Sequence, residues 1–260
     1  MRRPNSWLLV WLVAGVSAWP AQGQAPAEDP GGGRGGRGGP PPASPRAAAS
    51  IDMTGYWVSV VTEDWKFRMV TPRKGNFGGV PLNAEGRRVA DRWDSPKDEA
   101  RPLPCSYYGA AALMRVPGRL HISWDNDTTL KIETDAGTQT RLFHFRATLS
   151  EGIEPSGQGY SVAAWEFART GRGQPRKGDL KVVTANLLPG YLRTNGVPYS
   201  ANAVLIEYYD RLQGPNGDEW LVVTTEVRDP RYLTMPFVTS THFKKLADAN
   251  GWDPQPCRAE

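Results

Sequence analysis

The chain has 260 residues, of which 39% are hydrophobic and 22% charged, with 28 Gly and 23 Pro, and this composition excludes a coiled coil, a collagen and a wholly disordered chain. Its formal net charge is +4, but residues 1–50 carry five Arg and only two acidic residues. Subtracting these leaves 26 basic and 25 acidic side chains in residues 51–260, a net charge of +1. A domain this close to neutral has no general electrostatic attraction for nucleic acid or anionic lipid.

The N-terminus has the features of a secretory signal. Two arginines precede an uncharged run over residues 7–18, and small residues suit cleavage after Gly23. The run is too short to cross about 30 Å of hydrocarbon, and no later apolar run is long enough to be a membrane helix. We expect residues 1–23 to be a cleaved signal peptide, with an uncleaved interfacial anchor as the alternative. The mature protein is then exported to the periplasm or beyond, without an integral membrane segment.

Residues 24–50 are dominated by Gly and Pro and show no apolar periodicity. Such a segment cannot bury enough surface to offset its ordering entropy, so it is predicted to be a disordered linker. Its two Arg-Gly-Gly repeats would suggest RNA binding in an intracellular protein, but they follow an export signal and lack aromatic residues. A single folded domain is expected over residues 51–260, and no nucleic-acid partner is expected.

The two cysteines, Cys105 and Cys257, are far apart in the sequence and belong to no CxxC or Cys–His motif. In an oxidising compartment an isolated pair favours a disulfide, which would attach the C-terminal tail to the loop around Cys105. A catalytic thiol and a metal ligand are the competing interpretations.

Short runs of β-branched and aromatic residues, separated by Gly, Pro, Asn and Asp, fill the rest of the chain. This pattern is typical of an all-β fold. The runs predict strands over residues 56–62, 65–71, 112–116, 119–124, 128–134, 138–146, 160–167, 179–187, 203–212, 219–228 and 237–244. One short helix is predicted near 84–93, capped by Asn83.

Tight turns such as Asp125-Asn126-Asp127 favour antiparallel hairpins, because parallel pairs need long crossovers. Apolar and polar residues alternate in several strands, which indicates one packed face. Roughly ten hairpin-linked strands suit an antiparallel up-and-down β-barrel, since closure removes exposed edges. A two-sheet β-sandwich is the alternative.

Two resemblances follow from particular motifs. Gly55-Tyr56-Trp57 at the entry to the first strand resembles the lipocalin (calycin-like) Gly-x-Trp signature, in which the Trp closes the barrel base against an Arg from a late strand. The resemblance implies that role for Arg211 or Arg228.

Longer stretches resemble a broad family of uncharacterised exported bacterial proteins. They are residues 52–57, Gly159-Tyr160-Ser161-Val162 with Trp165-Glu166, Gly196-Val197-Pro198-Tyr199-Ser200, Glu207, and Asp229-Pro230 with Tyr232, Thr234 and Pro236. The family resemblance implies fold and export, and brings no activity. Residues 168–178 interrupt the family pattern after Trp165-Glu166 and predict a longer hairpin loop.

Sequence signatures of common enzymes are missing. No GxSxG, P-loop, GxGxxG before a helix or EF-hand motif occurs, which disfavours nucleophile-elbow hydrolases, NTPases and dinucleotide enzymes. The histidines His121, His144 and His242 show no metal-binding spacing. We therefore expect no metal and no cofactor, and whether the protein is an enzyme stays open.

Candidate site residues are charges and aromatic groups inside the predicted strands. A carboxylate on an inward barrel face is costly unless it is paired, for example with Arg141, and such a pair would orient a polar ligand head or act as acid and base. The alternative is that these charges face solvent and the aromatic groups are core. The candidates for ligand binding are Trp65, Arg141, His144, Trp165, Glu166, Glu207, Tyr209 and His242.

Three functions are compatible with these observations. The first is a carrier or sensor that binds a small, largely apolar or amphipathic ligand in the barrel. The second is an isomerase, cyclase or hydrolase in which an interior carboxylate and a His act together. The third is an extracellular module that binds glycan or protein through surface aromatic residues. We rank them in this order.

Overall fold

The structure is a computed structural model that describes residues 43–94, 105–149, 152–167 and 178–257. The predicted signal peptide, most of the predicted linker and most of the predicted loop over residues 168–178 lie outside the described residues. The account below concerns the compact unit formed by Pro42–Glu260.

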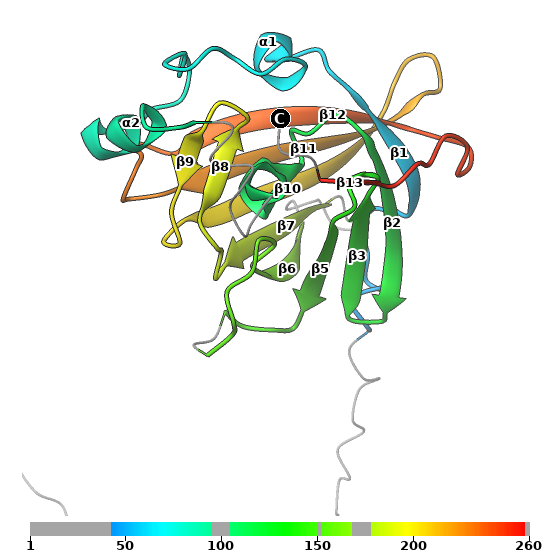
Figure 1. The fold of residues 1–260 in the computed structure, drawn as a ribbon. Helices are drawn as coiled ribbons and strands as arrows, with labels where there is room; N and C mark the ends of the chain where they lie inside the picture. Colours follow the sequence, from blue (N-terminus) through cyan, green and yellow to red (C-terminus); the bar gives the residue numbers. More distant parts are fainter. Residues whose placement is uncertain (1–42, 95–104, 150–151, 168–177, 258–260) are drawn as a thin grey trace, which may run out of the picture. The chain divides into compact units, whose positions relative to one another are not determined.

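The described chain is mostly β (Figure 1). Its strands are β1 Gly55–Val60, β2 Arg119–Asn126, β3 Thr129–Thr134, β4 Ala136–Gly137, β5 Thr140–Phe145, β6 Tyr160–Phe167, β7 Gly178–Ala185, β8 Gly190–Arg193, β9 Val197–Tyr199, β10 Val204–Gln213, β11 Glu219–Arg228, β12 Phe237–Lys245 and β13 Gln255–Pro256. Its helices are α1 Trp65–Arg68, α2 Ala84–Ala90, the 3₁₀ turn η1 Ser106–Tyr108 and α4 Ala110–Leu113.

Nine strands close into a barrel, in the order β1-β12-β11-β10-β7-β6-β5-β3-β2. The predicted barrel is therefore confirmed, and the alternative β-sandwich is wrong. The barrel is mixed, because β5 and β6 pair in parallel while every other neighbouring pair in it is antiparallel. Residues 146–159 connect these two strands and are long enough for the crossover that a parallel pair needs. The prediction of a wholly antiparallel up-and-down barrel is wrong at this point.

Alternation along the strands fills the interior. In β11, Leu221, Val223, Thr225 and Val227 are buried while the residues between them are only half-buried, as the two-residue period of a strand requires. Inward residues of all nine barrel strands pack into one core that contains Trp57, Ile122, Phe143, Leu180, Tyr209 and Phe243, each at most 1% exposed. The interior is thus occupied by side chains.

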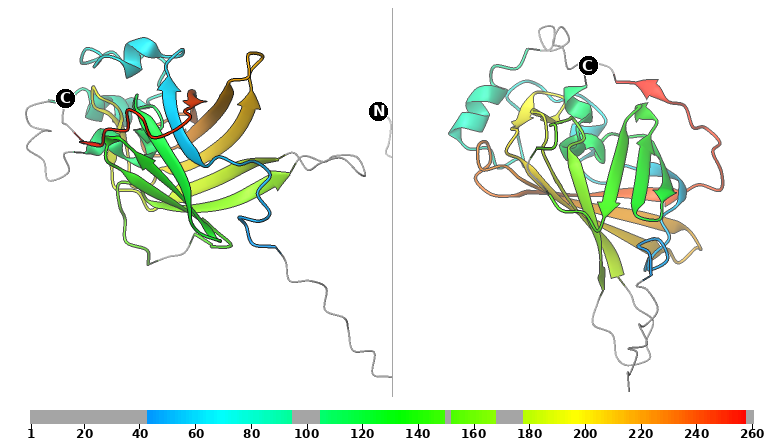
Figure 2. Two further views of the ribbon diagram at one scale, coloured as in Figure 1. Left: turned by 90° about the vertical axis from the view of Figure 1, so that its right-hand side faces the viewer. Right: turned by 90° about the horizontal axis from the view of Figure 1, so that it is seen from below.

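The helices α1 and α2 lie outside the ring of strands (Figures 1 and 2), whereas α4 is buried and its Leu113 packs into the barrel core. The predicted helix near 84–93 is present as α2, and the Asn83 side chain caps it by accepting a hydrogen bond from the Gly86 N–H at 2.8 Å. Two predicted strands, 65–71 and 112–116, are wrong. The first contains α1, in which the consecutive residues Phe67 and Arg68 are both buried, and the second overlaps the end of the alanine-rich α4.

A second apolar cluster lies against one end of the barrel. It joins residues of the loop before α2, of α4 and of the β8–β9 hairpin to the ends of β10, β11 and β12, and includes Phe77, Leu192, Tyr199, Leu205 and Phe237. We call this region the capped end. The β8–β9 pair was not predicted, because these strands are short and their residues are nearly all buried.

The predicted disulfide joins Cys105 to Cys257, with 5.4 Å between their Cα atoms. The tail is attached further by β13, which pairs in parallel with β4, and by a 2.8 Å hydrogen bond from the Gln255 N–H to the Asp135 carbonyl. Closing a loop of this length stabilises the fold by roughly 5 kcal/mol on the chain-entropy model, less any native strain.

Residues 43–51 lie against the other end of the barrel. The Trp165 indole donates a 2.9 Å hydrogen bond to the Pro45 carbonyl, and the Ser50 hydroxyl donates one of 3.0 Å to the Gly178 carbonyl. Residues 43–50, which the composition had assigned to the linker, thus contact the folded domain.

Candidate functional site

Two of the predicted site residues form a buried ion pair inside the barrel. Arg141 on β5 donates two hydrogen bonds to Glu207 on β10, with Nη1–Oε1 and Nη2–Oε2 distances of 2.9 and 2.6 Å. Both side chains are completely shielded from solvent. A bidentate arrangement of this kind holds both charges in an interior that would otherwise exclude them.

Neighbouring hydroxyl groups complete this interior polar cluster. Arg141 Nη2 also donates to Thr184 Oγ1 at 3.2 Å, and that hydroxyl lies 2.8 Å from the hydroxyl of Ser161. The Tyr209 hydroxyl donates to Glu207 Oε1 at 3.3 Å. Arg141 Nε is buried without a partner.

The protonation of the cluster follows from its surroundings. Burial has the largest effect and disfavours the Arg141 cation, but the charge of Glu207, the Tyr209 hydroxyl and the hydrogen bonds to both together outweigh it and raise the pKa of Arg141 above its usual value. Burial, reinforced by Glu207, holds the pKa of Tyr209 well above its usual value. Arg141 therefore stays charged and Tyr209 stays protonated, so neither is set up to exchange protons near neutral pH.

Other predicted site residues lie apart from this cluster. Trp165 packs at the opposite end of the barrel, where its ring centroid lies 5.5 Å from that of Phe145. Glu166 is exposed and accepts a 2.7 Å hydrogen bond from Lys181. Trp65 on α1 is 63% exposed.

The three histidines face outward from the barrel wall. His144 stacks on Tyr160 with 4.8 Å between ring centroids, and partial burial lowers its pKa. His242 Nδ1 lies 3.0 Å from Glu63 Oε2, and His121 Nδ1 lies 3.0 Å from Glu133 Oε2. Both are carboxylate–imidazole pairs, but neither contains a carboxylate predicted for the site, and both side chains of each pair are partly exposed.

The Gly-x-Trp motif is closed by a different cation from the one expected. The Nζ of Lys245 on β12 lies 4.5 Å from the centroid of the Trp57 ring, and it donates a hydrogen bond to the Thr54 carbonyl. Arg211 instead pairs with Glu219 at 2.6 Å, and Arg228 pairs with Glu226. The roles expected for Arg211 and Arg228 are wrong in this structure.

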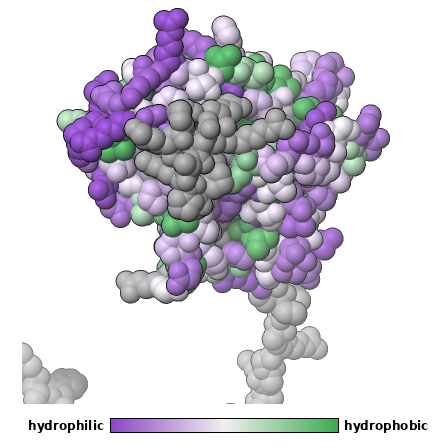
Figure 3. All heavy atoms as spheres, viewed as in Figure 1, coloured by the Kyte–Doolittle hydropathy of each residue, from purple (hydrophilic) through white to green (hydrophobic). Residues whose placement is uncertain are grey.

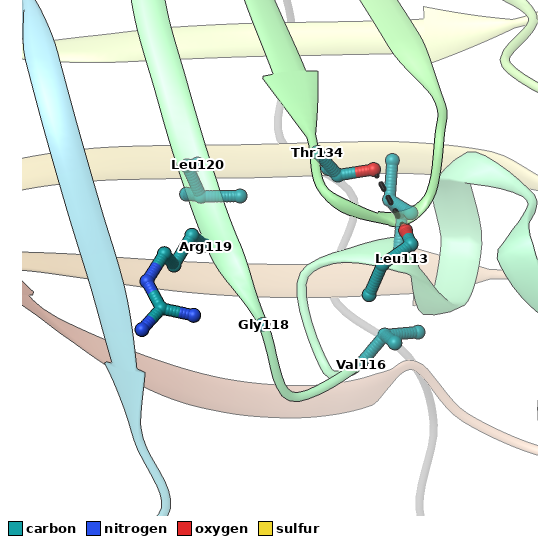
Figure 4. Close-up of a pocket in the computed structure, with 7 residues that line it drawn as sticks. Leu113, Val116, Gly118, Arg119, Leu120 and Thr134 are labelled. Atoms are coloured by element: carbon teal, nitrogen blue, oxygen red, sulfur yellow. Dashed lines mark hydrogen bonds between the residues drawn. The ribbon is translucent and has the colours of Figure 1, made fainter. Parts of the chain in front are cut away.

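The packing of the barrel wall is close where α4 meets the β2–β3 hairpin (Figure 4). Six residues around this gap are labelled there: Leu113, Val116, Gly118, Arg119, Leu120 and Thr134. The Thr134 hydroxyl donates a 2.9 Å hydrogen bond to the Ala136 carbonyl, and the remaining space is too small for a water molecule. This gap cannot hold a ligand.

A larger space lies outside the barrel, beside β8 and β9. It consists of two adjoining cavities of about 340 and 200 Å³ that share Ser106, Pro189 and Tyr199 in their walls. The larger cavity is also lined by the aromatic rings of Trp93, Tyr191 and Tyr232 and by Val89, Arg92, Gly190 and Pro198. The smaller is also lined by Cys105, Gly109, Gln139, Gly157, Gln158 and Leu188. We call the two together the β8–β9 cleft.

Two glycines make room for the tyrosine at the centre of this cleft. A Cβ atom on Gly109 would lie 2.1 Å from the Tyr199 hydroxyl oxygen, and one on Gly190 would lie 2.6 Å from it. Any larger residue at either position would displace the ring. Tyr199 is 1% exposed, and burial raises the pKa of its hydroxyl, which therefore stays protonated.

A buried carboxylate joins the two segments that carry Tyr199 and Tyr232. Asp229 accepts hydrogen bonds from the Ser200 N–H at 2.7 Å, from the Ser200 hydroxyl at 2.8 Å and from the Arg231 N–H at 3.0 Å. It therefore fixes the end of β9 to the loop after β11 and sets the distance between the two tyrosines.

Gln158 is a polar residue in the wall of the smaller cavity. Its Nε2 donates to the Tyr108 carbonyl at 2.8 Å and to Gln139 Oε1 at 2.9 Å. Its Oε1 is buried without a partner. Because this oxygen is shielded from the open volume, a molecule in the cavity reaches it only if the Gln158 side chain moves.

None of the eight predicted ligand-binding residues lines the β8–β9 cleft. Part of the cleft nevertheless comes from the segment 196–200 and from Tyr232, which the family resemblance singled out for their pattern rather than for a role. Because the cleft is assembled from α2, η1, β8, β9 and the loop after β11, only the fold brings its residues together.

No family model matches this chain, and no curated protein or solved structure is significantly similar to it. Of the two resemblances, the structure shows only the closed β-barrel, and neither family is identified. Within the described residues, no helix is long and apolar enough to cross a membrane. In the same residues, no three or more His, Cys, Asp or Glu side chains are grouped to hold a metal ion.

Proposed function

We propose that this protein is an exported binding protein that holds a small amphipathic ligand in the β8–β9 cleft, outside the barrel. The observation that carries the proposal is the pair of adjoining cavities around Tyr199, whose larger member reaches the usual size of a small-molecule site. The Cys105–Cys257 disulfide supports export, because such bonds persist in oxidising compartments.

The lining of the cleft indicates the chemistry of the ligand. Aromatic rings and prolines form the walls of the larger cavity, which suits a flat apolar face of the ligand. Gln139 and Gln158 supply amide groups in the smaller cavity, which suits a hydroxyl or amide of the ligand. Among the described residues that line the cleft, Arg92 alone is charged, so the ligand carries at most a single negative charge.

The barrel interior gives less support to a carrier. Its apolar side chains pack against each other, and the carboxylate oxygens of Glu207 are already bonded to Arg141. The same pairing weakens the enzyme alternative that relied on an interior carboxylate. The Glu63–His242 pair is within reach for proton exchange, but neither residue lines the β8–β9 cleft.

Native mass spectrometry of the mature protein, purified from its own exported fraction, tests the proposal. We expect a reproducible mass excess that is lost on denaturation. Val89→Trp, which fills the larger cavity from α2, should abolish the excess without lowering the melting temperature. Leu212→Trp places the same side chain at an exposed position on β10 and serves as the control.

Retention of the ligand by Val89→Trp would exclude the cleft as its site. A wild-type mass equal to the bare chain would argue against a tightly held ligand of any kind.

A further inference from the structure

Large apolar side chains are exposed around α1, at the capped end. Trp65, Met69 and Val70 in and after this helix are 63%, 56% and 57% exposed, and Met235 before β12 and Val238 near its start are 64% and 58% exposed. We call these five residues the α1 surface. In Figure 3 hydrophobic spheres gather at the top of the molecule, where Figure 1 shows α1 above β12. Such a group of exposed apolar side chains marks an interaction site.

The two parts of this surface meet over one buried arginine. The guanidinium of Arg193 lies 3.9 Å from the ring centroid of Phe67, on α1, and 5.8 Å from that of Phe237, on β12. The chain leaving β1 also stays beside β12, since Val60 pairs with His242 and Glu63 bonds to the same histidine. Phe67 and Phe237 therefore lie close together, which brings α1 near the start of β12.

Hydrogen bonds beneath the helix hold α1 in place. Arg68, which is buried, donates from Nε to the Arg115 carbonyl at 2.9 Å and from Nη1 to Glu63. The Arg115 guanidinium in turn lies 3.3 Å from the Asp64 carboxylate. Because its underside is fixed, α1 cannot rotate to bury Trp65 and Met69.

Basic residues border the exposed apolar side chains. Lys66, Arg73 and Lys74 are exposed, whereas the acids of the same segment, Glu63 and Asp64, are engaged by Arg68 and Arg115. The segment thus presents unbalanced positive charge beside a tryptophan, although the domain as a whole is nearly neutral.

We propose that the α1 surface docks on an anionic lipid bilayer as a peripheral contact. Tryptophan, methionine and valine side chains enter the boundary between headgroups and acyl chains, while lysine and arginine contact lipid phosphates. A second copy of the chain is a poorer occupant, since Lys66 lies between Trp65 and Phe67 and would meet like charge across a symmetric contact. The proposal does not depend on the β8–β9 cleft.

Co-sedimentation with lipid vesicles tests this proposal. The full mature protein should bind vesicles of equal parts phosphatidylglycerol and phosphatidylcholine, and should bind pure phosphatidylcholine at least tenfold more weakly. One basic side chain near an anionic surface contributes roughly fivefold to vesicle affinity. The double variant Lys66→Glu/Lys74→Glu should lose more than this factor for each residue, because it also adds negative charge. The double variant Trp65→Ser/Met69→Ser should lose binding while keeping the wild-type melting temperature, because both side chains are exposed.

Leu212→Ser removes an equally exposed apolar side chain from β10 and should bind like the wild type. Equal binding to both kinds of vesicle, or unchanged binding by both double variants, would overturn the proposal. So would a concentration-dependent dimer in sedimentation velocity that Trp65→Ser abolishes, which would assign the surface to a second copy of the chain.

Discussion

The barrel interior and the β8–β9 cleft both combine aromatic rings with polar side chains, yet they differ in the open volume that is left around those side chains. In the interior, both carboxylate oxygens of Glu207 bond to Arg141, and side chains fill the space around them. In the cleft, Gln139 and Gln158 border open volume. The Arg141–Glu207 pair is thus part of the packed core, whereas the cleft keeps volume that a ligand can occupy.

The two regions also differ in how their backbone is built. The interior is lined by long strands whose alternating side chains converge on the axis and pack densely. The cleft is bordered by short strands, helix ends and loops, and by glycines and prolines that leave volume where side chains would otherwise be. Irregular segments beside a regular barrel therefore supply the space for a ligand.

The largest loss of stability is expected from breaking the interior ion pair between Arg141 and Glu207. Glu207→Ala leaves the Arg141 cation buried and unpaired, which should lower the free energy of unfolding by about 3–5 kcal/mol. Urea denaturation followed by circular dichroism measures this loss. The double variant Arg141→Met/Glu207→Leu removes both charges and should lie within about 2 kcal/mol of the wild type. A loss below about 1 kcal/mol for Glu207→Ala would show that the interior admits water, contrary to a filled barrel.

The next largest loss of stability is expected from removing Asp229, the carboxylate that joins β9 to the loop after β11. Asp229→Ala deprives the Ser200 N–H, the Ser200 hydroxyl and the Arg231 N–H of their acceptor, and should cost about 2–3 kcal/mol of unfolding free energy. The exposed Asp253→Ala serves as the control. Asp229→Ala should also release any ligand held in the cleft. Glu207→Ala should lower the free energy of unfolding more than Asp229→Ala does. Equal ligand retention by the wild type and Asp229→Ala would show that the Asp229 carboxylate is not needed for ligand binding.

Much of the barrel could be predicted from the sequence, because a long run in which apolar and polar residues alternate is compatible with a strand and with little else. The strands β10 and β11 fall within a residue or so of their predicted bounds, since apolar residues recur there at every second position. The run after Asp64 misled the prediction, because the order Trp, Lys, Phe, Arg also alternates. Tertiary contacts of Phe67 and Arg68 with Arg193 and Arg115 decide that this segment is helical.

The candidate site was harder to predict for a geometric reason. Arg141 and Glu207 lie on β5 and β10, which are separated by β6 and β7 in the barrel order, so their contact depends on closure and register. The β8–β9 cleft depends on contacts between segments with no periodic pattern. A single sequence carries local propensity and alternation, but not the distances between such segments.

A smaller effect is expected inside the cleft itself. Gly190→Ala would bring its Cβ to 2.5 Å from the Ser106 carbonyl oxygen and 2.6 Å from the Tyr199 hydroxyl. Overpacking of this kind should cost about 1–2 kcal/mol and weaken retention of any cleft ligand. Gly78→Ala makes only ordinary contacts, at 3.6 Å or more, and should change stability by less than about 0.5 kcal/mol. Thermal unfolding and native mass spectrometry on both variants provide the measurement.

The smallest effect contrasts the two faces of β10, where Glu207 is paired inward and Asp210 is directed outward beside Asp179. Burial, with the hydrogen bond and negative charge of Asp179, raises the pKa of Asp210 to about 6. Because the folded state holds this proton more tightly than the unfolded state, whose Asp pKa is near 3.8, the contribution of Asp210 to stability should rise as the pH falls from about 7 to about 4. Asp210→Asn should therefore stabilise the protein at pH 7 relative to pH 4, by about 1 kcal/mol or less because the group is partly exposed. Urea unfolding of wild type and variant at both pH values measures the difference, with the exposed Asp248→Asn as the control. If wild type and Asp210→Asn differ in free energy of unfolding by the same amount at both pH values, Asp179 and Asp210 do not share a proton. The outer face of β10 would then hold two negative charges side by side, whereas Glu207 on the inner face needs Arg141 as its partner.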